Sequence, residues 1–259
     1  MANNEINPNE IQNHITTLKK IDIISFTTLD STNTYAKNHS DEFSNSHPTL
    51  IIADQQTAGY GRFKRGFFSP KDTGIYLSLV LPINNIDDPS LLTLATGVAV
   101  VSALREMTNS QLINLKWVND ILIHDKKCGG ILTESISDSH GKISKVIVGI
   151  GLNINTLEFP EELENIATSI SDEIDLERNT IVSQIIKNFF KLDLTGNDFL
   201  SDYRTYCSTL GKTIQVVNGN QTIAGKAIEI ADDGSLVLID DKKNRHRINS
   251  GEVTKIYLN

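Results

Sequence analysis

Glycine and positive charge meet in one short stretch of an acidic chain. Residues 55–70 read QQTAGYGRFKRGFFSP, while the formal net charge of the 259 residues is -8. Glycine lets backbone N–H groups approach a ligand, and the side chains of Arg62, Lys64 and Arg65 can donate charge-assisted hydrogen bonds to phosphate or carboxylate oxygens. The stretch has neither the Gly-Lys-Ser/Thr of a P-loop nor the third glycine of a dinucleotide fingerprint. Alone, it indicates an anion-binding loop or, equally well, a solvated basic hairpin tip.

A second candidate segment, KWVNDILIHDKKCGG, runs from residue 116 to 130. Lys127 stands just before a glycine pair, where it can reach a phosphate without steric hindrance. Asn119 and Asp120 can orient a nucleophile or bind Mg²⁺. The alternative is an Asn-Asp turn flanked by solvent-facing lysines, and the segment alone favours this simpler interpretation.

A third segment, VIVGIGLNIN, carries two glycines inside a β-branched strand. Gly149 and Gly151 indicate close approach by another backbone or by a planar ligand. Asn153 would then be able to contact an adenine edge. The alternative is tight strand packing with an asparagine at the strand end.

The predicted elements place these segments at strand ends and turns. We expect a strand, a turn and a helix over 21–39, with Asp30 or Ser31 as the helix cap. Further strands are predicted near 49–56 and 74–82, and several more between 112 and 155. The clearest helix spans 88–107, with Asp88 as its cap and Pro89 at its first position. Two more helices are predicted, within 178–194 and near 197–206, and the first 20 residues are expected to be peripheral.

Composition limits the class of protein. The chain suits one medium domain plus a small one, because short alternating strands with Asn-Gly, Asp-Gly and Ser-Gly turns replace the mixed pattern after about residue 210. We expect that β module to dock on the larger unit. No apolar run is long enough to span a membrane, and no signal peptide is evident. Two cysteines favour a reducing cytoplasm, and a pI near 5.2 argues against nonspecific nucleic-acid binding.

Together and in order, six segments resemble the biotin–protein ligases, also called biotin–[acetyl-CoA-carboxylase] ligases. They are DSTN (30–33), QTAGYGR (56–62) followed by FSP, KWVND (116–120), KKCGGILTE (126–134), VGIGLNIN (148–155) and SGEVT (250–254). The resemblance covers about residues 24–259. It implies an α+β fold, with a mixed β-sheet flanked by helices as in class II aminoacyl-tRNA synthetases and a C-terminal SH3-like β-barrel. The implied division is a catalytic domain over 1–208 and the small domain over 209–259.

The resemblance also implies an activity and its partners. Family members join biotin to ATP, giving biotinyl-5′-AMP and pyrophosphate, and then transfer biotin to a lysine of the biotin carboxyl carrier domain of acetyl-CoA carboxylase. Mg²⁺ is expected with ATP, without assigned protein ligands. A repressor's DNA-binding domain needs roughly 50 residues, and only about 20 precede the first predicted core strand. We therefore expect a monofunctional cytoplasmic enzyme that binds neither DNA nor membrane and is able to form a homodimer through the sheet edge.

The resemblance assigns roles to individual residues. Asp120 is the candidate for accepting the proton of the incoming lysine amine, Asn119 for orienting a carboxylate or metal, and Lys127 for offsetting charge at the α-phosphate. The implied catalytic residues are Arg62, Lys116, Asn119, Asp120 and Lys127. The implied biotin-binding residues are Ser31, Thr32, Asn33, Gln56, Gly59, Tyr60, Gly61, Arg62, Lys127, Gly129 and Gly130. The implied ATP-binding residues are Arg62, Phe67, Asn119, Lys127 and Asn153.

This chain departs from the family pattern in the basic loop. The family loop reads Gly-Arg-Gly-Arg-x-Gly-Arg-x-Trp, whereas here Tyr60 replaces the first arginine, Lys64 a glycine and Phe67 the tryptophan. Val118 replaces the proline of Lys-Trp-Pro-Asn-Asp. We expect the loop to be a lid over biotin and adenylate, with phenylalanines 63, 67 and 68 excluding water.

Two other functions are consistent with these residues. One is a lipoate or octanoate ligase or transferase of related fold. The other is a biotin-responsive binding module that lacks catalysis, which the tyrosine at position 60 makes worth testing. The polar DSTN segment and Gln56 favour a ureido head over an acyl chain, because an acyl chain would need an apolar tunnel.

Overall fold

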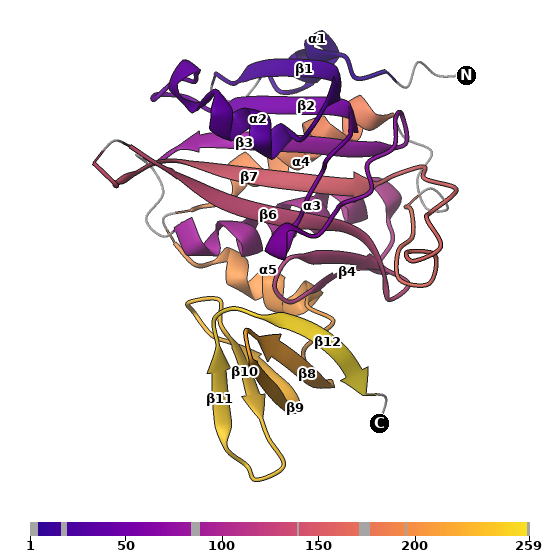
Figure 1. Ribbon diagram of the computed structural model, residues 1–259, viewed down its shortest axis with the longest axis vertical. Coiled ribbons are helices and arrows are strands. Elements are labelled where there is room, and N and C mark those ends of the chain that lie inside the picture. Colours follow the sequence, from indigo (N-terminus) through magenta and orange to yellow (C-terminus); the bar gives the residue numbers. More distant parts are fainter. Residues whose placement is uncertain are drawn as a thin grey trace.

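The structure consists of two β-sheets, one large and one small. The computed structural model describes residues 5–16, 20–83, 89–138, 140–170, 177–194 and 196–257. The larger sheet has seven strands in the order β1-β2-β3-β7-β6-β5-β4, and the smaller has five in the order β11-β10-β9-β8-β12 (Figure 1). The smaller sheet sits below one end of the larger unit, at the C-terminal end of the chain.

The seven-stranded sheet is mixed, as expected. Its first two strands pair in parallel, and each other pair of neighbours is antiparallel. The strands are β1 (Asp22–Leu29), β2 (Thr49–Gln56), β3 (Gly74–Pro82), β4 (Ile113–Lys116), β5 (Asp120–Ile123), β6 (Lys126–Ser137) and β7 (Ile143–Asn153). The apolar runs of β2 and β3 are buried on both faces of the sheet, which matches their near-continuous hydrophobic sequences.

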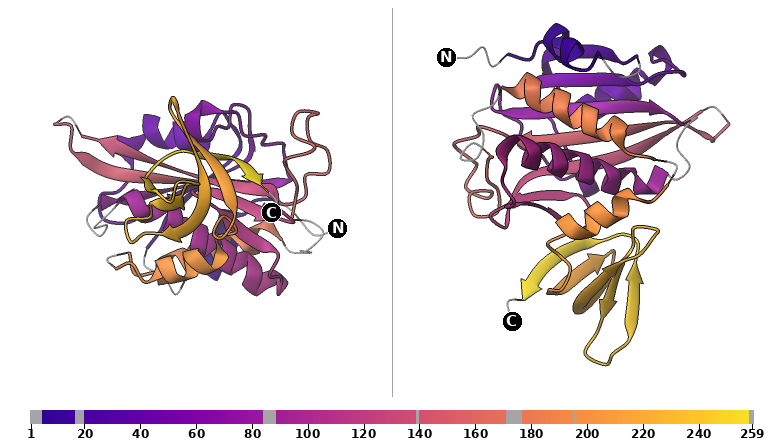
Figure 2. Two further views of the ribbon diagram at one scale, coloured as in Figure 1. Left: turned by 90° about the horizontal axis from the view of Figure 1, so that it is seen from below. Right: turned by 180° about the vertical axis from the view of Figure 1, so that it is seen from behind.

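Helices cover both faces of this sheet. They are α1 (Pro8–His14), α2 (Thr32–Asn38), α3 (Leu92–Thr108), α4 (Arg178–Lys191) and α5 (Phe199–Tyr206). The third and fourth lie on one face, seen from behind in Figure 2, and α2 lies on the opposite face. Short 3₁₀ turns occur at η1 (Ser40–Glu42), η2 (Arg62–Lys64) and η4 (Pro89–Leu91). Pro89 therefore begins a 3₁₀ turn and not the α-helix itself, and Asp88 lies outside the described residues.

Residues 5–16 are not peripheral, which corrects the expectation for this part of the N-terminal segment. Asn7 caps α1 by accepting hydrogen bonds from two backbone N–H groups of the first turn. Ile11 and Ile15 are 0% and 1% exposed and belong to the main hydrophobic core. The Asn179 amide of α4 donates to Glu10 at 2.9 Å. The polar appearance of this segment hid two apolar side chains spaced four residues apart, the spacing of one helix face.

The small sheet docks on the larger unit through specific hydrogen bonds, as expected. Its strands are β8 (Thr213–Asn218), β9 (Gln221–Ile230), β10 (Leu236–Ile239), β11 (Arg245–Ile248) and β12 (Glu252–Tyr257). The indole Nε1 of Trp117 donates to the Gly234 carbonyl at 3.1 Å, and Arg204 Nε donates to the Ile230 carbonyl at 2.8 Å. Within the described part of the chain, no helix is long and apolar enough to cross a membrane.

Candidate active site

A cavity of about 130 Å³ lies where α2, the basic loop and the ends of β5, β6 and β7 converge. Most of the residues implied by the resemblance line it: Ser31, Thr32, Asn33, Gln56, Tyr60, Gly61, Arg62, Phe67, Asn119, Asp120, Lys127 and Gly130. Gly59, Lys116, Gly129 and Asn153 are not among the residues that line it. The fold therefore brings residues from four of the six family-like segments to one place.

One end of the cavity is a neutral hydrogen-bond network. The backbone N–H and hydroxyl of Thr32 both donate to Gln56 Oε1, at 2.9 and 3.1 Å. The Gln56 amide in turn donates to Ser69 Oγ at 3.1 Å. The buried Ser78 hydroxyl lies 2.7 Å from Thr32 Oγ1 and 2.5 Å from Asn33 Oδ1. Amide and hydroxyl groups held this way suit a neutral, polar ring that needs both donors and acceptors.

A helix start fixes the position of this network. Ser31 is the N-cap of α2, and its hydroxyl accepts a hydrogen bond from the Thr34 N–H at 3.4 Å, so one of the two expected caps is confirmed. Asp30 instead accepts from the Ser31 N–H at 2.6 Å. Because the cap orients the first helical turn, Thr32 and Asn33 face the sheet with 3% and 4% exposure.

The opposite end of the cavity carries charge. Lys127 Nζ lies 2.6 Å from Asp120 Oδ1, and Lys116 Nζ lies 3.7 Å from Asp120 Oδ2. The strand pairing shifts register here, because Ile121 pairs with Gly129 while its neighbour pairs with Lys127, which leaves an extra residue in β6. Such a bulge redirects a side chain, and here it occurs directly beside the lysine.

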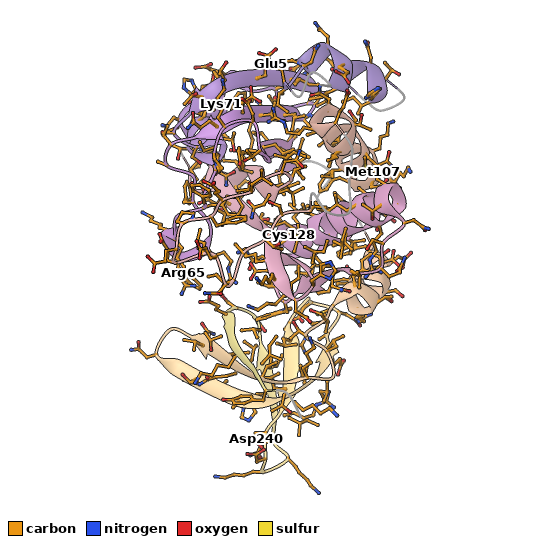
Figure 3. All side chains as sticks on the ribbon, turned by 90° about the vertical axis from the view of Figure 1, so that its right-hand side faces the viewer. Glu5, Arg65, Lys71, Met107, Cys128 and Asp240 are labelled. Atoms are coloured by element: carbon orange, nitrogen blue, oxygen red, sulfur yellow. The ribbon has the colours of Figure 1, made fainter. Side chains whose placement is uncertain are left out.

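The basic loop is fixed to the small sheet. Arg62 donates to the Gly251 carbonyl at 2.8 Å and to Ser250 Oγ at 3.2 Å, and lies 3.4 Å from Asn119 Oδ1. Arg65 forms an ion pair with Glu252. Figure 3 shows Arg65 on the side of the large unit that faces the small sheet. Burial lowers the pKa of the Arg62 guanidinium, against the opposing charges of nearby carboxylates.

Tyr60, which replaces an arginine of the family pattern, belongs to a polar cluster. Its hydroxyl donates to Glu134 Oε2 at 2.9 Å and lies 3.1 Å from Lys37 Nζ. Lys37 pairs with the other oxygen of Glu134 at 2.5 Å. Asn33 donates to the same carboxylate at 2.8 Å, which connects the cluster to the neutral end of the cavity.

The two glycines of β7 leave room for neighbouring side chains. A Cβ at Gly151 would stand 2.7 Å from the Phe67 ring, and one at Gly149 would collide with Asn33. Phe67 also packs edge-on against Tyr76 at a centroid distance of 6.5 Å. The sequence predicted close approach by another backbone or by a planar ligand. The structure instead places the side chains of Asn33 and Phe67 against these glycines.

The three phenylalanines of the loop differ in position. Phe67 covers β7, and Phe68 packs against Phe159 at 6.2 Å. Phe63 is 63% exposed, with the Arg62 and Arg65 guanidinium carbons 5.0 and 5.9 Å from its ring centroid. An apolar closure over the cavity is thus provided by Phe67, while Phe63 supports the two arginines.

Asn153 is buried at the end of β7 with one polar atom unsatisfied. Its amide nitrogen donates to the Thr168 carbonyl at 3.2 Å. Among the residues that the structure describes, no group donates to its Oδ1. A buried carbonyl oxygen without a partner carries a free-energy cost, and a ligand amino group is one way to remove it.

Comparison with known proteins gives the same assignment over most of the chain. The biotin/lipoate A/B protein ligase family matches residues 25–153, and the biotin protein ligase C terminal domain matches residues 209–255. The biotin–[acetyl-CoA-carboxylase] ligase of Mycobacterium tuberculosis is 30% identical over 202 residues, covering 73% of this chain and 72% of that protein. A solved biotin protein ligase from Aquifex aeolicus, in complex with biotin and ATP, has a TM-score of 0.76 and 30% identity, covering 90% of this chain and 97% of that one.

The chain belongs to the biotin protein ligase family. The resemblance and the expected fold class are therefore confirmed. The bifunctional ligase/repressor BirA of Bacillus subtilis is 37% identical over 200 residues, which cover 73% of this chain but only 61% of that protein.

Several site residues were missed from the sequence. Ser69 and Ser78 complete the neutral end, and Lys37, Glu134 and Glu252 complete the charged contacts. Glu134 and Glu252 lie within two of the family-like segments, which was the available signal. Lys37 and Ser78 have no such signal, because the packing of α2 against β3 and β7 is what brings them to Glu134 and to the lining residues Thr32 and Asn33.

Proposed function

We propose that this protein is a cytoplasmic, ATP-dependent biotin–protein ligase that forms biotinyl-5′-AMP and then biotinylates a carrier protein. The observation that carries the proposal is a single cavity with a neutral hydrogen-bonding end and a cationic end. The neutral end, with Thr32 and Gln56, suits the ureido ring of biotin. Arg62 and Lys127 at the other end suit a carboxylate and a phosphate. A lipoyl chain lacks the polar head that the neutral network would satisfy.

In the first step, a carboxylate oxygen of biotin attacks the α-phosphorus of ATP and pyrophosphate leaves. Lys127 offsets negative charge that develops at the phosphate, and Arg62 binds the phosphate oxygens. In the present arrangement both cations contact protein groups, namely Asp120 and the Gly251 carbonyl. We infer that phosphate oxygens take over part of these contacts when ATP binds.

In the second step, the lysine amine of the carrier attacks the carbonyl carbon of the adenylate and AMP leaves. Asp120 accepts the proton that the amine loses. Its carboxylate lies 3.7 Å from Lys116 Nζ and 2.6 Å from Lys127 Nζ. Asn119 lies beside Arg62 and holds the strand by donating to the Ile131 carbonyl at 3.1 Å.

The site fits Mg²⁺ only as a companion of the nucleotide. In the described ranges, no cluster of three or more His, Cys, Asp or Glu side chains could hold a metal ion. Asp120 and Glu252 each bring one carboxylate to the cavity. Mg²⁺ commonly binds one or two carboxylates together with substrate phosphates, and it would supply charge neutralisation there. The unsatisfied Oδ1 of Asn153 suits the amino group of adenine.

The remaining assignments concern domains, partners and location. We propose that the catalytic domain ends at residue 208 and the small domain begins at residue 209, just before β8. The partner is a biotin carboxyl carrier domain of acetyl-CoA carboxylase, and β1 is the open sheet edge available for a homodimer. The free, buried Cys128 and Cys207 suit a reducing cytoplasm. Sedimentation at several concentrations tests the dimer.

One assay tests the function. The protein is incubated with ATP, Mg²⁺, a biotin carrier domain and either biotin, lipoate or octanoate, and pyrophosphate and labelled carrier are measured. Carrier labelling with biotin alone supports the proposal. Lipoyl or octanoyl transfer would favour the other branch of the family, and biotin binding without pyrophosphate release would favour a binding module.

A further inference from the structure

The basic loop stands closed over the cavity. Tyr60, Gly61 and Arg62 all line it, and Tyr60 and Gly66 form a β-bridge that holds the loop as a narrow hairpin. The cavity volume of about 130 Å³ is smaller than the roughly 300–1,000 Å³ of typical small-molecule pockets. Because the loop forms part of the cavity wall, the contacts that hold it affect how fast a ligand as large as an adenylate enters and leaves.

Two sets of contacts hold the loop. On one side, Arg62 and Arg65 bind the Ser250–Glu252 turn of the small sheet. On the other side, Tyr60 binds Glu134, and this carboxylate also accepts hydrogen bonds from Lys37 and Asn33. The second set connects the loop to α2 and β6 without any ligand.

In this second set of contacts, the opposite charges of Lys37 and Glu134 are paired, and both groups also have hydrogen-bond partners. Burial alone would lower the pKa of Lys37, but its hydrogen bonds to Glu134 and Tyr60 outweigh burial and raise it. Burial likewise would raise the pKa of Glu134, yet hydrogen bonds from Lys37, Asn33 and Tyr60 lower it. Burial raises the pKa of the Tyr60 hydroxyl, which therefore keeps its proton at neutral pH and can donate to the carboxylate.

We propose that Tyr60, Glu134 and Lys37 form a latch that holds the basic loop closed and slows release of the bound adenylate. Glu134 is the acceptor, Lys37 is the positioning residue that fixes its charge and orientation, and Tyr60 is the part that moves with the loop. The retention role rests on the proposed ligase function. The latch itself rests on the geometry alone.

The chemistry explains why a tyrosine can stand where the family pattern has an arginine. An arginine at this position would place a cation directly on the ligand or on Glu134. In this chain the cation is Lys37 of α2, whose ammonium lies 5.5 Å from the Tyr60 ring centroid. The ammonium is also within hydrogen-bond distance of the Tyr60 hydroxyl and of Glu134 Oε1. The loop thus gains a charge-assisted hydrogen bond to Glu134 and carries no charge of its own at this position.

The first experiment measures amide hydrogen exchange of residues 59–66 in the ligand-free protein. Tyr60→Phe removes only the hydroxyl, and Glu134→Gln and Lys37→Met remove its partners. Each variant should raise exchange of the loop about five- to tenfold, the effect of losing one typical hydrogen bond at a partly exposed site, while exchange of the core strands stays unchanged. The double variant Tyr60→Phe/Glu134→Gln should be little worse than either single variant, because both remove the same contact.

The second experiment measures release of preformed adenylate from the same variants by exchange into excess unlabelled biotin and ATP. Release should accelerate about five- to tenfold, in step with the loop exchange. Tyr35→Phe is the matched control, because it removes a hydroxyl from α2 and keeps the ring contacts with Phe26 and His39.

The outcomes separate the two proposals. Unchanged loop exchange in all three variants would overturn the latch, whatever the activity. Faster loop exchange with unchanged adenylate release would overturn its retention role. If the wild-type protein forms no adenylate from biotin and ATP, the ligase function is wrong, and the exchange result still decides whether the latch exists.

Discussion

The two ends of the cavity are built on different principles. At the neutral end, hydroxyl and amide groups of Thr32, Gln56, Ser69 and Ser78 satisfy one another through short hydrogen bonds within the large sheet. At the charged end, Lys127 is paired with a carboxylate of its own sheet, and Arg62 with carbonyl and hydroxyl groups of the small sheet. The groups of the neutral end are therefore already oriented by the protein before a ligand binds. At the charged end, the cations are paired with protein groups that a ligand phosphate is expected to replace in part.

This difference has an energetic consequence. A neutral network that is already oriented loses little entropy when a ligand binds, so its contribution is mainly affinity. Cations paired with protein groups must exchange those partners for phosphate oxygens, and their largest effect comes where charge develops in the transition state. We therefore expect substitutions at the charged end to change the rate of adenylation, and substitutions at the neutral end to change the affinity for biotin.

The largest effect is expected for Lys127→Met. This change keeps the length of the side chain but removes the charge that is proposed to act at the α-phosphate, so the single-turnover rate of adenylate formation should fall about 10²–10³-fold. Biotin affinity measured by calorimetry without ATP should change much less.

Lys127→Arg is the matched control for this prediction. It keeps the positive charge beside Asp120 and should retain a substantial part of the rate. Equal losses in the methionine and arginine variants would mean that Lys127 acts through shape and not through charge.

The second effect, in order of size, is expected for Gln56→Met. Thr32 would lose the acceptor for both its N–H and its hydroxyl, and Ser69 would lose a donor. Leaving buried polar groups unpaired costs about 1–3 kcal/mol, so the biotin Kd should rise at least about tenfold. The adenylation rate at saturating biotin should stay near that of the wild type.

Gln55→Met is the control for the neighbouring position of the same strand. The Gln55 side chain contacts Thr28 on the outer side of β2. Its biotin Kd should equal that of the wild type. A comparable rise in Kd in both variants would show that β2 itself, and not the neutral network, had been disturbed.

Features of the two ends that depend on local contacts were predictable from the sequence, whereas features that depend on long-range packing were not. The cap at Ser31, the glycines of β7 and the lysine beside the glycine pair were predictable, because each is a short pattern with a direct physical reading. The burial of Ile11 and Ile15 was missed because it depends on the packing of α1 against α4 and β1, which lie far away in the sequence or are not part of the local pattern. Lys37 and Ser78 were missed for the same reason, since each contacts its partner near the cavity across a large gap in sequence. Asn153 was predicted to contact adenine, and that contact stays a prediction.

Raising the salt concentration should change ligand binding at the charged end but not at the neutral end, without any substitution. The contacts expected for ATP are between opposite charges at a partly exposed site, whereas those expected for the biotin head are between neutral dipoles. Raising the KCl concentration from about 0.05 to about 0.3 M shortens the screening length by more than half. The KM for ATP should therefore rise several-fold, while the Kd for biotin stays constant. A parallel rise in both constants would contradict the division of the cavity into a neutral and a charged end.

The smallest effect is expected for Glu252→Gln, which tests how strongly the small sheet restrains the charged end. Glu252 pairs with Arg65 and also adds to the negative field around Arg62. Its ion pair is partly exposed, and such pairs contribute about 0–1 kcal/mol, so the thermal stability should hardly change. With one competing carboxylate removed, the cations are freer to bind phosphate, and the KM for ATP should fall no more than about threefold. Glu229→Gln, which breaks an exposed arginine pair elsewhere on the same sheet, should leave the KM for ATP unchanged. If Glu252→Gln raises that KM instead, the small sheet positions the arginines for ATP and does not merely hold them until ATP binds.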